Sequence, residues 1–207
     1  MNKKLVQILA FVFLVAIGAN AQPLTLGVKA GLNSSKLTGQ SFGGYSTSFN
    51  GGIYAASTFN QKWGWQIEVG YNNQIENINT AGFNTVYTPS ETNNDVSSTA
   101  TIGTVAIPFL FTYKLNNFFS LHAGPQVSFN AYTSQNMFEN GSVPFKVVDF
   151  WGCIGGNLDL GGINFYLRYN NGFTNINSYD NPNRDKWMNR QINFGLEVPV
   201  ITLHKKK

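Results

Sequence analysis

Charged residues and cysteine are both scarce in this chain of 207 residues. Only 12% of the residues are charged, about half the usual share for a soluble domain. A composition this poor in charge argues against an enzyme with a solvated helical surface. The single cysteine, Cys153, permits no internal disulfide, so the fold must hold without one.

Long apolar runs are also missing beyond the N-terminus, so no segment after residue 21 resembles a transmembrane helix. The N-terminus has the pattern of a secretory signal peptide. Lys3 and Lys4 precede an apolar core at residues 5–17, and Ala19-Asn-Ala21 gives an A-x-A cleavage pattern. We therefore expect a signal peptide at residues 1–21 and an exported mature chain at residues 22–207.

Aromatic residues, glycine and period-two alternation are abundant instead. In residues 119–129, apolar side chains at odd positions alternate with polar or small ones at even positions. This alternation is typical of a β-strand with one apolar and one polar face. The strand predicted at residues 99–115 has apolar residues on both faces, so its facing stays open. The predicted strands are residues 24–33, 50–59, 63–73, 99–115, 119–129, 147–160, 163–169 and 191–200.

The connections between these strands alternate between long and short. Short links fall at Asn60-Gln61, Asn116-Asn117 and Gly161-Gly162, all turn-forming residues. Outer-membrane barrels have tight periplasmic turns and larger outer loops. The pattern therefore predicts an all-β fold, a closed antiparallel up-and-down transmembrane β-barrel of about eight strands. The long polar links are residues 38–48, 75–98, 133–146 and 175–187.

Alternation alone does not say whether the apolar face lines the lumen, as in a soluble lipocalin-like barrel, or meets lipid. An eight-stranded barrel has an interior only just wide enough for side chains to fill. The apolar faces carry many aromatic rings, whereas the opposite faces carry glycine and polar residues, so we expect the apolar faces outside. The aromatic residues expected to form two interfacial girdles are Trp63, Trp65 and Phe118 near short turns, and Tyr71, Tyr132, Tyr169 and Trp187 near long loops.

Four charged residues of the alternating strands, two of each sign, all lie on the polar faces: Lys29, Glu68, Arg168 and Glu197. A basic group facing lipid at the midplane costs on the order of 2–4 kcal/mol, and an acid somewhat less. An ion path is one interpretation of this set, and a packed network in a narrow lumen is the one that we favour. The residues predicted to form this lumen network are Lys29, Glu68, His122, Arg168 and Glu197.

Four segments, in the expected order along the mature chain, resemble a known family. They are Gly27-Val-Lys-Ala-Gly-Leu-Asn33, Ile107-Pro-Phe-Leu110, Leu121-His-Ala-Gly-Pro125 and Leu167-Arg-Tyr-Asn-Asn-Gly-Phe-Thr-Asn-Ile176. In these the chain is similar to the small PorT-like outer-membrane β-barrels of Bacteroidota. The resemblance implies an outer membrane protein beta-barrel domain. Because a few relatives support the type IX secretion system, it also implies an envelope or secretion-associated role.

Motifs for catalysis or cofactor binding are missing. The chain has no phosphate-binding loop, dinucleotide fingerprint or zinc-ligand spacing. His122 lies on an inward polar face, His204 lies in the terminal tail, and the long loops contain no histidine. Glu76, Glu91 and Asp95 offer the oxygen ligands that calcium prefers, but we expect them to be solvated loop charges. We therefore expect no catalytic residues, no cofactor and no metal.

The function expected from these features is a non-enzymatic outer-membrane barrel with a filled lumen. Lipid surrounds the barrel, and the long outer loops bind an unidentified protein or glycan. The mildly basic composition does not indicate nucleic acid, because much of the excess charge lies in Lys205-Lys-Lys207. Two alternatives remain open, a channel for small solutes and a soluble periplasmic lipocalin-like barrel.

Overall fold

The computed structural model describes residues 22–39, 42–77, 99–133, 145–178 and 186–203. The expected signal peptide lies outside these residues. In the described part of the chain, no helix is both long and apolar enough to cross a membrane.

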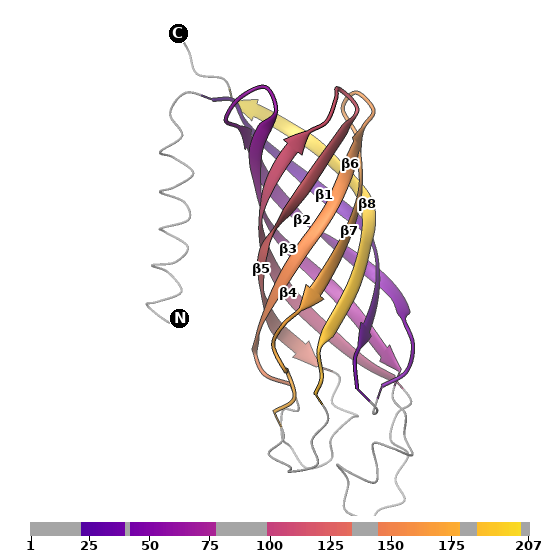
Figure 1. Cartoon of the computed structure of the whole chain (residues 1–207). Helices are drawn as coiled ribbons and strands as arrows, with labels where there is room; N and C mark the ends of the chain where they lie inside the picture. The colour runs from indigo at the N-terminus through magenta and orange to yellow at the C-terminus, as the bar shows by residue number, and fades with distance from the viewer. Residues whose placement is uncertain (1–21, 40–41, 78–98, 134–144, 179–185, 204–207) are drawn as a thin grey trace, which may run out of the picture.

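Eight antiparallel strands form a closed barrel in the order β1 to β8 (Figure 1). The strand number and the closed up-and-down topology confirm the predicted fold. The strands are β1 (Leu24–Leu37), β2 (Ser46–Thr58), β3 (Trp63–Asn77), β4 (Thr99–Lys114), β5 (Phe119–Thr133), β6 (Val148–Asp159), β7 (Asn164–Gly172) and β8 (Asn189–Leu203).

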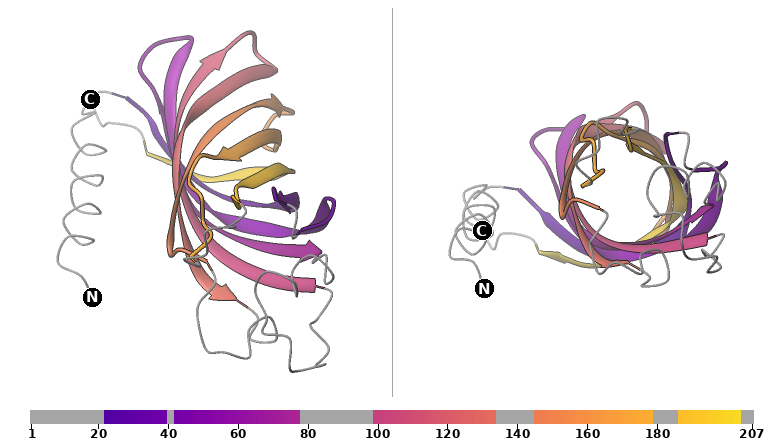
Figure 2. Two further views of the ribbon diagram at one scale, coloured as in Figure 1. Left: turned by 60° about the horizontal axis from the view of Figure 1, so that its bottom comes forward. Right: turned by 90° about the horizontal axis from the view of Figure 1, so that it is seen from below.

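The barrel closes where β1 pairs with β8, with Leu24 opposite Leu203 and Leu37 opposite Asn189. Figure 2 shows the resulting ring of strands from the long-loop end. The three short turns lie at the end where β1 begins and β8 ends, and the strand ends that the four long connections join lie at the opposite end (Figure 1). We call these the short-turn end and the outer end.

Side chains fix the short turns where the sequence predicts them. Asn60 Oδ1 accepts hydrogen bonds from the backbone amides of Lys62 and Trp63 at 2.9 and 2.8 Å. Asn116 Oδ1 does the same for the amides two and three residues further on, both at 2.8 Å. The third turn uses positive φ angles at Gly161 and Gly162, 75° and 117°, which glycine adopts without steric cost.

The apolar faces of the strands point outward. Val28, Phe111 and Leu167 are 46%, 51% and 59% exposed, whereas the alternate positions of the same strands are mostly buried. The soluble lipocalin-like alternative needs the reverse facing, so the structure does not support it. The open question in β4 is also answered, because Ile102 and Leu110 point inward and are 1% and 0% exposed.

Most strands extend further toward the outer end than the alternation predicts. β1 continues from residue 33 to Leu37, and β3 from residue 73 to Asn77. On β3 the facing of the pattern is unchanged, with Ile75 outward and Glu76 inward, but on β1 it reverses. On β1, Ser34 and Lys36 point outward while Leu37 is buried inside. Because the apolar residue at the end of β1 points inward, the alternation that predicts this strand ends before the strand does.

Candidate functional site

Four charged side chains meet in the middle of the lumen. Lys29 Nζ lies 2.7 Å from Glu68 Oε2 and 3.4 Å from Glu197 Oε1. Arg168 reaches Glu68 from the other side, with Nη2 2.6 Å from Oε1. The cluster therefore contains two positive and two negative groups, each at most 5% exposed, and has no net formal charge.

Strand register explains this meeting. Lys29 and Glu197 are direct cross-strand partners on β1 and β8, so barrel closure places them side by side. Glu68 comes from β3 and Arg168 from β7, and both side chains extend into the lumen. Pleating sends every second side chain inward, so each of these residues points to the interior from its own strand.

Hydrogen bonds from neutral side chains complete the cluster. Gln66 Nε2 donates to Glu68 Oε1 at 2.8 Å and to Glu197 Oε1 at 3.0 Å. Arg168 donates twice to Glu68, through Nη1 and Nη2 at 3.0 and 2.6 Å, and its Nε donates to His122 Nε2 at 3.1 Å. Since His122 accepts at Nε2, this nitrogen carries no proton. All five residues of the predicted network thus lie in one connected cluster.

Two tyrosine rings, which the sequence prediction did not include, fill the space around the charges. The Lys29 ammonium lies 4.1 Å from the centre of the Tyr166 ring. The Tyr166 hydroxyl donates to Asn50 Oδ1 at 2.6 Å. Glycines make room for the rings, since a Cβ at Gly31 would lie 2.7 Å from the Tyr166 hydroxyl and one at Gly27 would overlap the Tyr54 ring. The sequence places Tyr166 on a polar face, and this was the signal from which its position in the lumen could have been predicted.

A second closure lies at the outer end, where a small apolar core fills the mouth of the barrel. The Trp187 ring lies 5.0 Å from Phe42 and 5.5 Å from Phe145, between ring centres. Trp187 is fully buried, so its predicted place in an interfacial girdle is wrong. The segment before β8 turns this ring into the mouth. The core consists of Leu37, Phe42, Ala100, Ile102, Phe145, Ile176 and Trp187.

The outer girdle otherwise contains exposed rings as predicted, at Tyr71, Tyr132 and Tyr169. At the short-turn end Trp63 and Phe118 are 51% and 61% exposed. Trp65 differs from the prediction, because it is only 7% exposed.

The placement of Glu76 in a solvated loop is wrong. Glu76 lies near the end of β3, points inward and is 1% exposed. Its Oε2 accepts a hydrogen bond from the Leu37 amide at 2.8 Å. The reason is that β3 continues to Asn77 with unchanged facing, so Glu76 points inward like Glu68. Glu91 and Asp95 lie outside the described residues.

A polar cavity of about 410 Å³ opens at the short-turn end and is bounded inside by Tyr54 and Gln66. Thr25, Thr112 and Asn157 contribute to its wall. Asn157 Nδ2 donates to Glu197 Oε2 at 3.2 Å, which links this wall to the ionic cluster. The cavity is therefore a vestibule that ends at the cluster.

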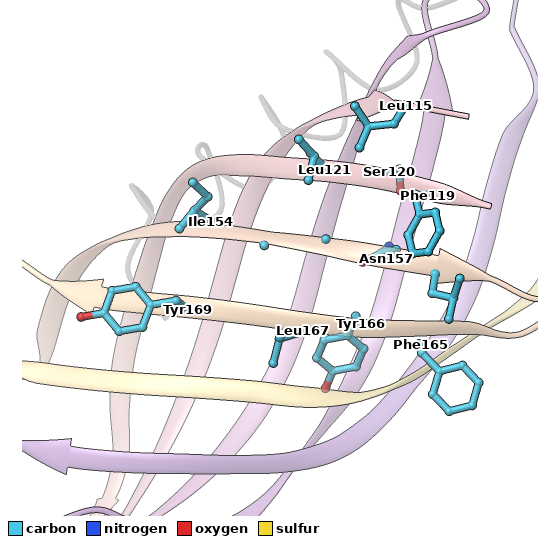
Figure 3. Close-up of a pocket in the computed structure, with 13 residues that line it drawn as sticks. Leu115, Phe119, Ser120, Leu121, Ile154, Asn157, Phe165, Tyr166, Leu167 and Tyr169 are labelled. Carbon is cyan, nitrogen blue, oxygen red and sulfur yellow. The ribbon is translucent and has the colours of Figure 1, made fainter. Parts of the chain in front are cut away.

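A larger groove of about 560 Å³ lies on the outside of the barrel. Figure 3 shows Leu121, Ile154 and Leu167 along it, from β5, β6 and β7. The groove exists because Gly156 presents no side chain to the outer surface of β6. It lies among the exposed apolar residues and offers little chemistry to a polar substrate.

The lumen also contains the lone cysteine of the chain, Cys153. The buried Cys153 thiol donates to Gln126 Oε1 at 3.4 Å. No group of three or more His, Cys, Asp or Glu residues in the described ranges could hold a metal ion. The carboxylates of the cluster are neutralised by Lys29 and Arg168 rather than arranged around a reacting atom.

Comparison with known proteins agrees with this architecture. A family model described as outer membrane protein beta-barrel domain matches residues 20–178. The chain superposes with a TM-score of 0.50, at 10% identity, on a crystal structure of Ail. Ail is the attachment invasion locus protein of Yersinia pestis, and this structure is its complex with the heparin analogue sucrose octasulfate. A second structure of Ail gives 0.46 at 9% identity. Both alignments cover 87% of this chain and 99% of that chain. No curated protein sequence matches this chain.

Proposed function

Because the chain belongs to the outer membrane protein beta-barrel domain family, we propose that it is a non-enzymatic interaction barrel. In this proposal the lumen conducts no solute, and the long loops at the outer end bind a partner. The observation that carries the proposal is the ionic cluster of Lys29, Glu68, Arg168 and Glu197, which crosses the lumen with every charge paired.

Physical chemistry favours a permanent closure. A solute moving past the cluster would have to separate buried ion pairs, and breaking one buried pair costs about 3–5 kcal/mol. The Tyr54 and Tyr166 rings occupy the same level of the barrel, and the apolar core around Trp187 closes the outer mouth. Two closures of different chemistry in one narrow lumen argue against the small-solute channel.

The surface left for a specific interaction is the outer end. Four long connections gather there, and long loops on a rigid scaffold commonly carry recognition. Ail shows that a barrel of this fold can be crystallised with a ligand, in that case a heparin analogue. The partner proposed for this chain is an envelope protein or a surface glycan. The resemblance to PorT-like barrels makes the type IX secretion system the first complex to test.

Conductance in planar lipid bilayers tests the closed lumen. We expect the purified, refolded chain to give no sustained open state, while a porin in the same bilayers conducts. A reproducible open state of this chain would overturn the proposal and restore the channel alternative.

Partner capture tests the role of the loops. Cross-linking on whole cells compares the complete chain with variants that lack residues 80–96 or 136–143. We expect at least one shortened variant to lose the cross-linked partner while it keeps the heat-dependent gel mobility of a folded barrel. Unchanged cross-linking in all loop variants would argue against recognition by these loops.

A further inference from the structure

Lys36 and Arg190 form a like-charged pair on the outer surface of the barrel. They are direct cross-strand partners on β1 and β8, and both point outward. Like charges directly opposite each other destabilise a sheet. A sheet that keeps such a pair gains from an anion bound between the two groups.

The described part of the chain supplies no such anion. Neither Lys36 nor Arg190 makes an ion pair with a described residue. Four of the five described acidic residues, Glu68, Glu76, Asp149 and Glu197, point into the lumen and are at most 4% exposed. The fifth, Asp159, lies beside the short turn at the other end.

The position of Lys36 and Arg190 along the barrel wall indicates which part of the membrane surrounds them. Along the β1–β8 seam, the outward pairs Val28–Val198, Ala30–Leu196 and Leu32–Phe194 are all apolar. The next outward pair is Ser34–Ile192, and Lys36–Arg190 follows it. The two cations therefore lie directly beyond the apolar band, at the level where the lipid headgroups of the outer leaflet begin.

The neighbours of the pair fit this interface. The Lys36 ammonium lies 4.8 Å from the centre of the Tyr45 ring, which is 44% exposed. On the other side, Asn171 of β7 is the cross-strand partner of Arg190, and the Tyr169 hydroxyl lies 3.4 Å from Asn171 Oδ1. Aromatic rings with a polar tip are typical of the membrane–water interface.

We propose that Lys36 and Arg190 bind the phosphate of an outer-leaflet lipid headgroup. Arginine presents a planar fork of donors that matches phosphate oxygens, and lysine adds a compact positive charge. A phosphate between them replaces repulsion by two charge-assisted contacts, while the acyl chains of the same lipid cover the apolar pairs below. The site fixes one lipid on the β1–β8 seam, where the barrel closes.

The inference rests on the location of the barrel in an outer membrane and is independent of the loop partner. The test uses the full mature chain refolded into phosphatidylcholine nanodiscs that contain a small fraction of phosphatidic acid. Native mass spectrometry measures the phosphatidic acid that each barrel retains. We expect K36Q/R190Q to retain at least about tenfold less than the unchanged chain, because it removes both charge-assisted contacts and the loss of one alone corresponds to about tenfold.

A matched control removes the same charge from the same end. K146Q/K186Q neutralises two exposed lysines that are not cross-strand partners in the strands, and we expect it to retain phosphatidic acid like the unchanged chain. Equal losses of retained phosphatidic acid in both double variants would show that general charge attraction causes the retention, and would overturn the proposed site. No loss in K36Q/R190Q would overturn it as well.

Two further arms identify the ligand. Oleate in place of phosphatidic acid supplies a carboxylate on an acyl chain, and we expect weaker retention because the phosphate recognition is lost. Inorganic phosphate in solution should not displace the lipid; full displacement at millimolar concentration would assign the site to free phosphate and overturn the lipid proposal.

The gel mobility shift on heating verifies that each variant folds. If the double variant does not fold, K36Q and R190Q are measured singly, and we expect each to show intermediate retention. Cross-linking of the loop partner is measured on the same variants, and its result does not depend on whether the lipid site exists.

Discussion

Arg168 is the residue on which the ionic cluster depends most. Its guanidinium makes two hydrogen bonds to Glu68 and one to His122, and the residue is only 2% exposed. Removing it leaves two buried carboxylates with a single cation, Lys29. An uncompensated buried charge is expensive, whereas a balanced removal of both partners can be nearly neutral.

We therefore predict that R168M lowers the free energy of unfolding by about 3–5 kcal/mol. The measurement is urea unfolding in lipid vesicles, followed by the gel mobility of folded and unfolded forms. K62M, which removes an exposed lysine from the turn between β2 and β3, is the control and should change stability by about 0.5 kcal/mol or less. The double variant R168M/E68M should recover part of the loss. A loss below about 1 kcal/mol in R168M would contradict a tightly closed cluster.

At the scale of the strands, the sequence predicted the core of the barrel well and the outer ends poorly. Strands β5 and β8 alternate cleanly because one side meets an apolar surrounding and the other a polar lumen. Beyond that band both sides change, so Leu37 and Ile102 turn inward as part of an apolar core. A single alternation rule cannot describe a strand that passes through two environments.

The lumen network could be predicted from the sequence, whereas the outer apolar core could not. Lys29 and Glu197 could be paired from the sequence, because the first and last strands of a closed barrel must be neighbours. The outer core joins residues from β1, β4 and three separate connections. Phe42, Phe145 and Trp187 share no period along the chain, so only the folded structure brings them together.

We predict that W187A opens the outer mouth. The large ring is fully buried between Phe42 and Phe145, and replacing a buried Trp by Ala typically costs about 3–5 kcal/mol. The loss of the ring should increase the hydrogen-exchange rate of the Leu37 amide, which donates a hydrogen bond to Glu76 at the outer end of β1. F173A, at a residue that is 64% exposed, is the matched control and should leave that exchange rate unchanged. Equal exchange rates in W187A and the unchanged chain would show that the ring does not close the mouth.

At the scale of the whole molecule, we expect that water-borne solutes do not pass through the barrel. Among the residues that the structure describes, the apolar wall, the ionic cluster and the outer apolar core leave a polar opening in the vestibule at the short-turn end. We propose that a barrel built in this way acts through its loops and its lipid-facing surface. The lone cysteine offers a direct test, because Cys153 points into the lumen and is 5% exposed.

We predict that a charged methanethiosulfonate reagent does not label Cys153 in the folded barrel and labels it fully after thermal unfolding. A thiol must reach solvent to react, and this one lies against Gln126 inside the closed lumen. The control is C153S/K114C, which moves the cysteine to the rim of the vestibule and should be labelled rapidly without unfolding. The R168M variant adds a graded case, since weakening the ionic cluster should raise the labelling rate of Cys153 while leaving that of the rim cysteine unchanged. Rapid labelling of Cys153 in the unaltered folded chain would mean that water and small ions reach the middle of the lumen, and the barrel would have to be treated as a channel.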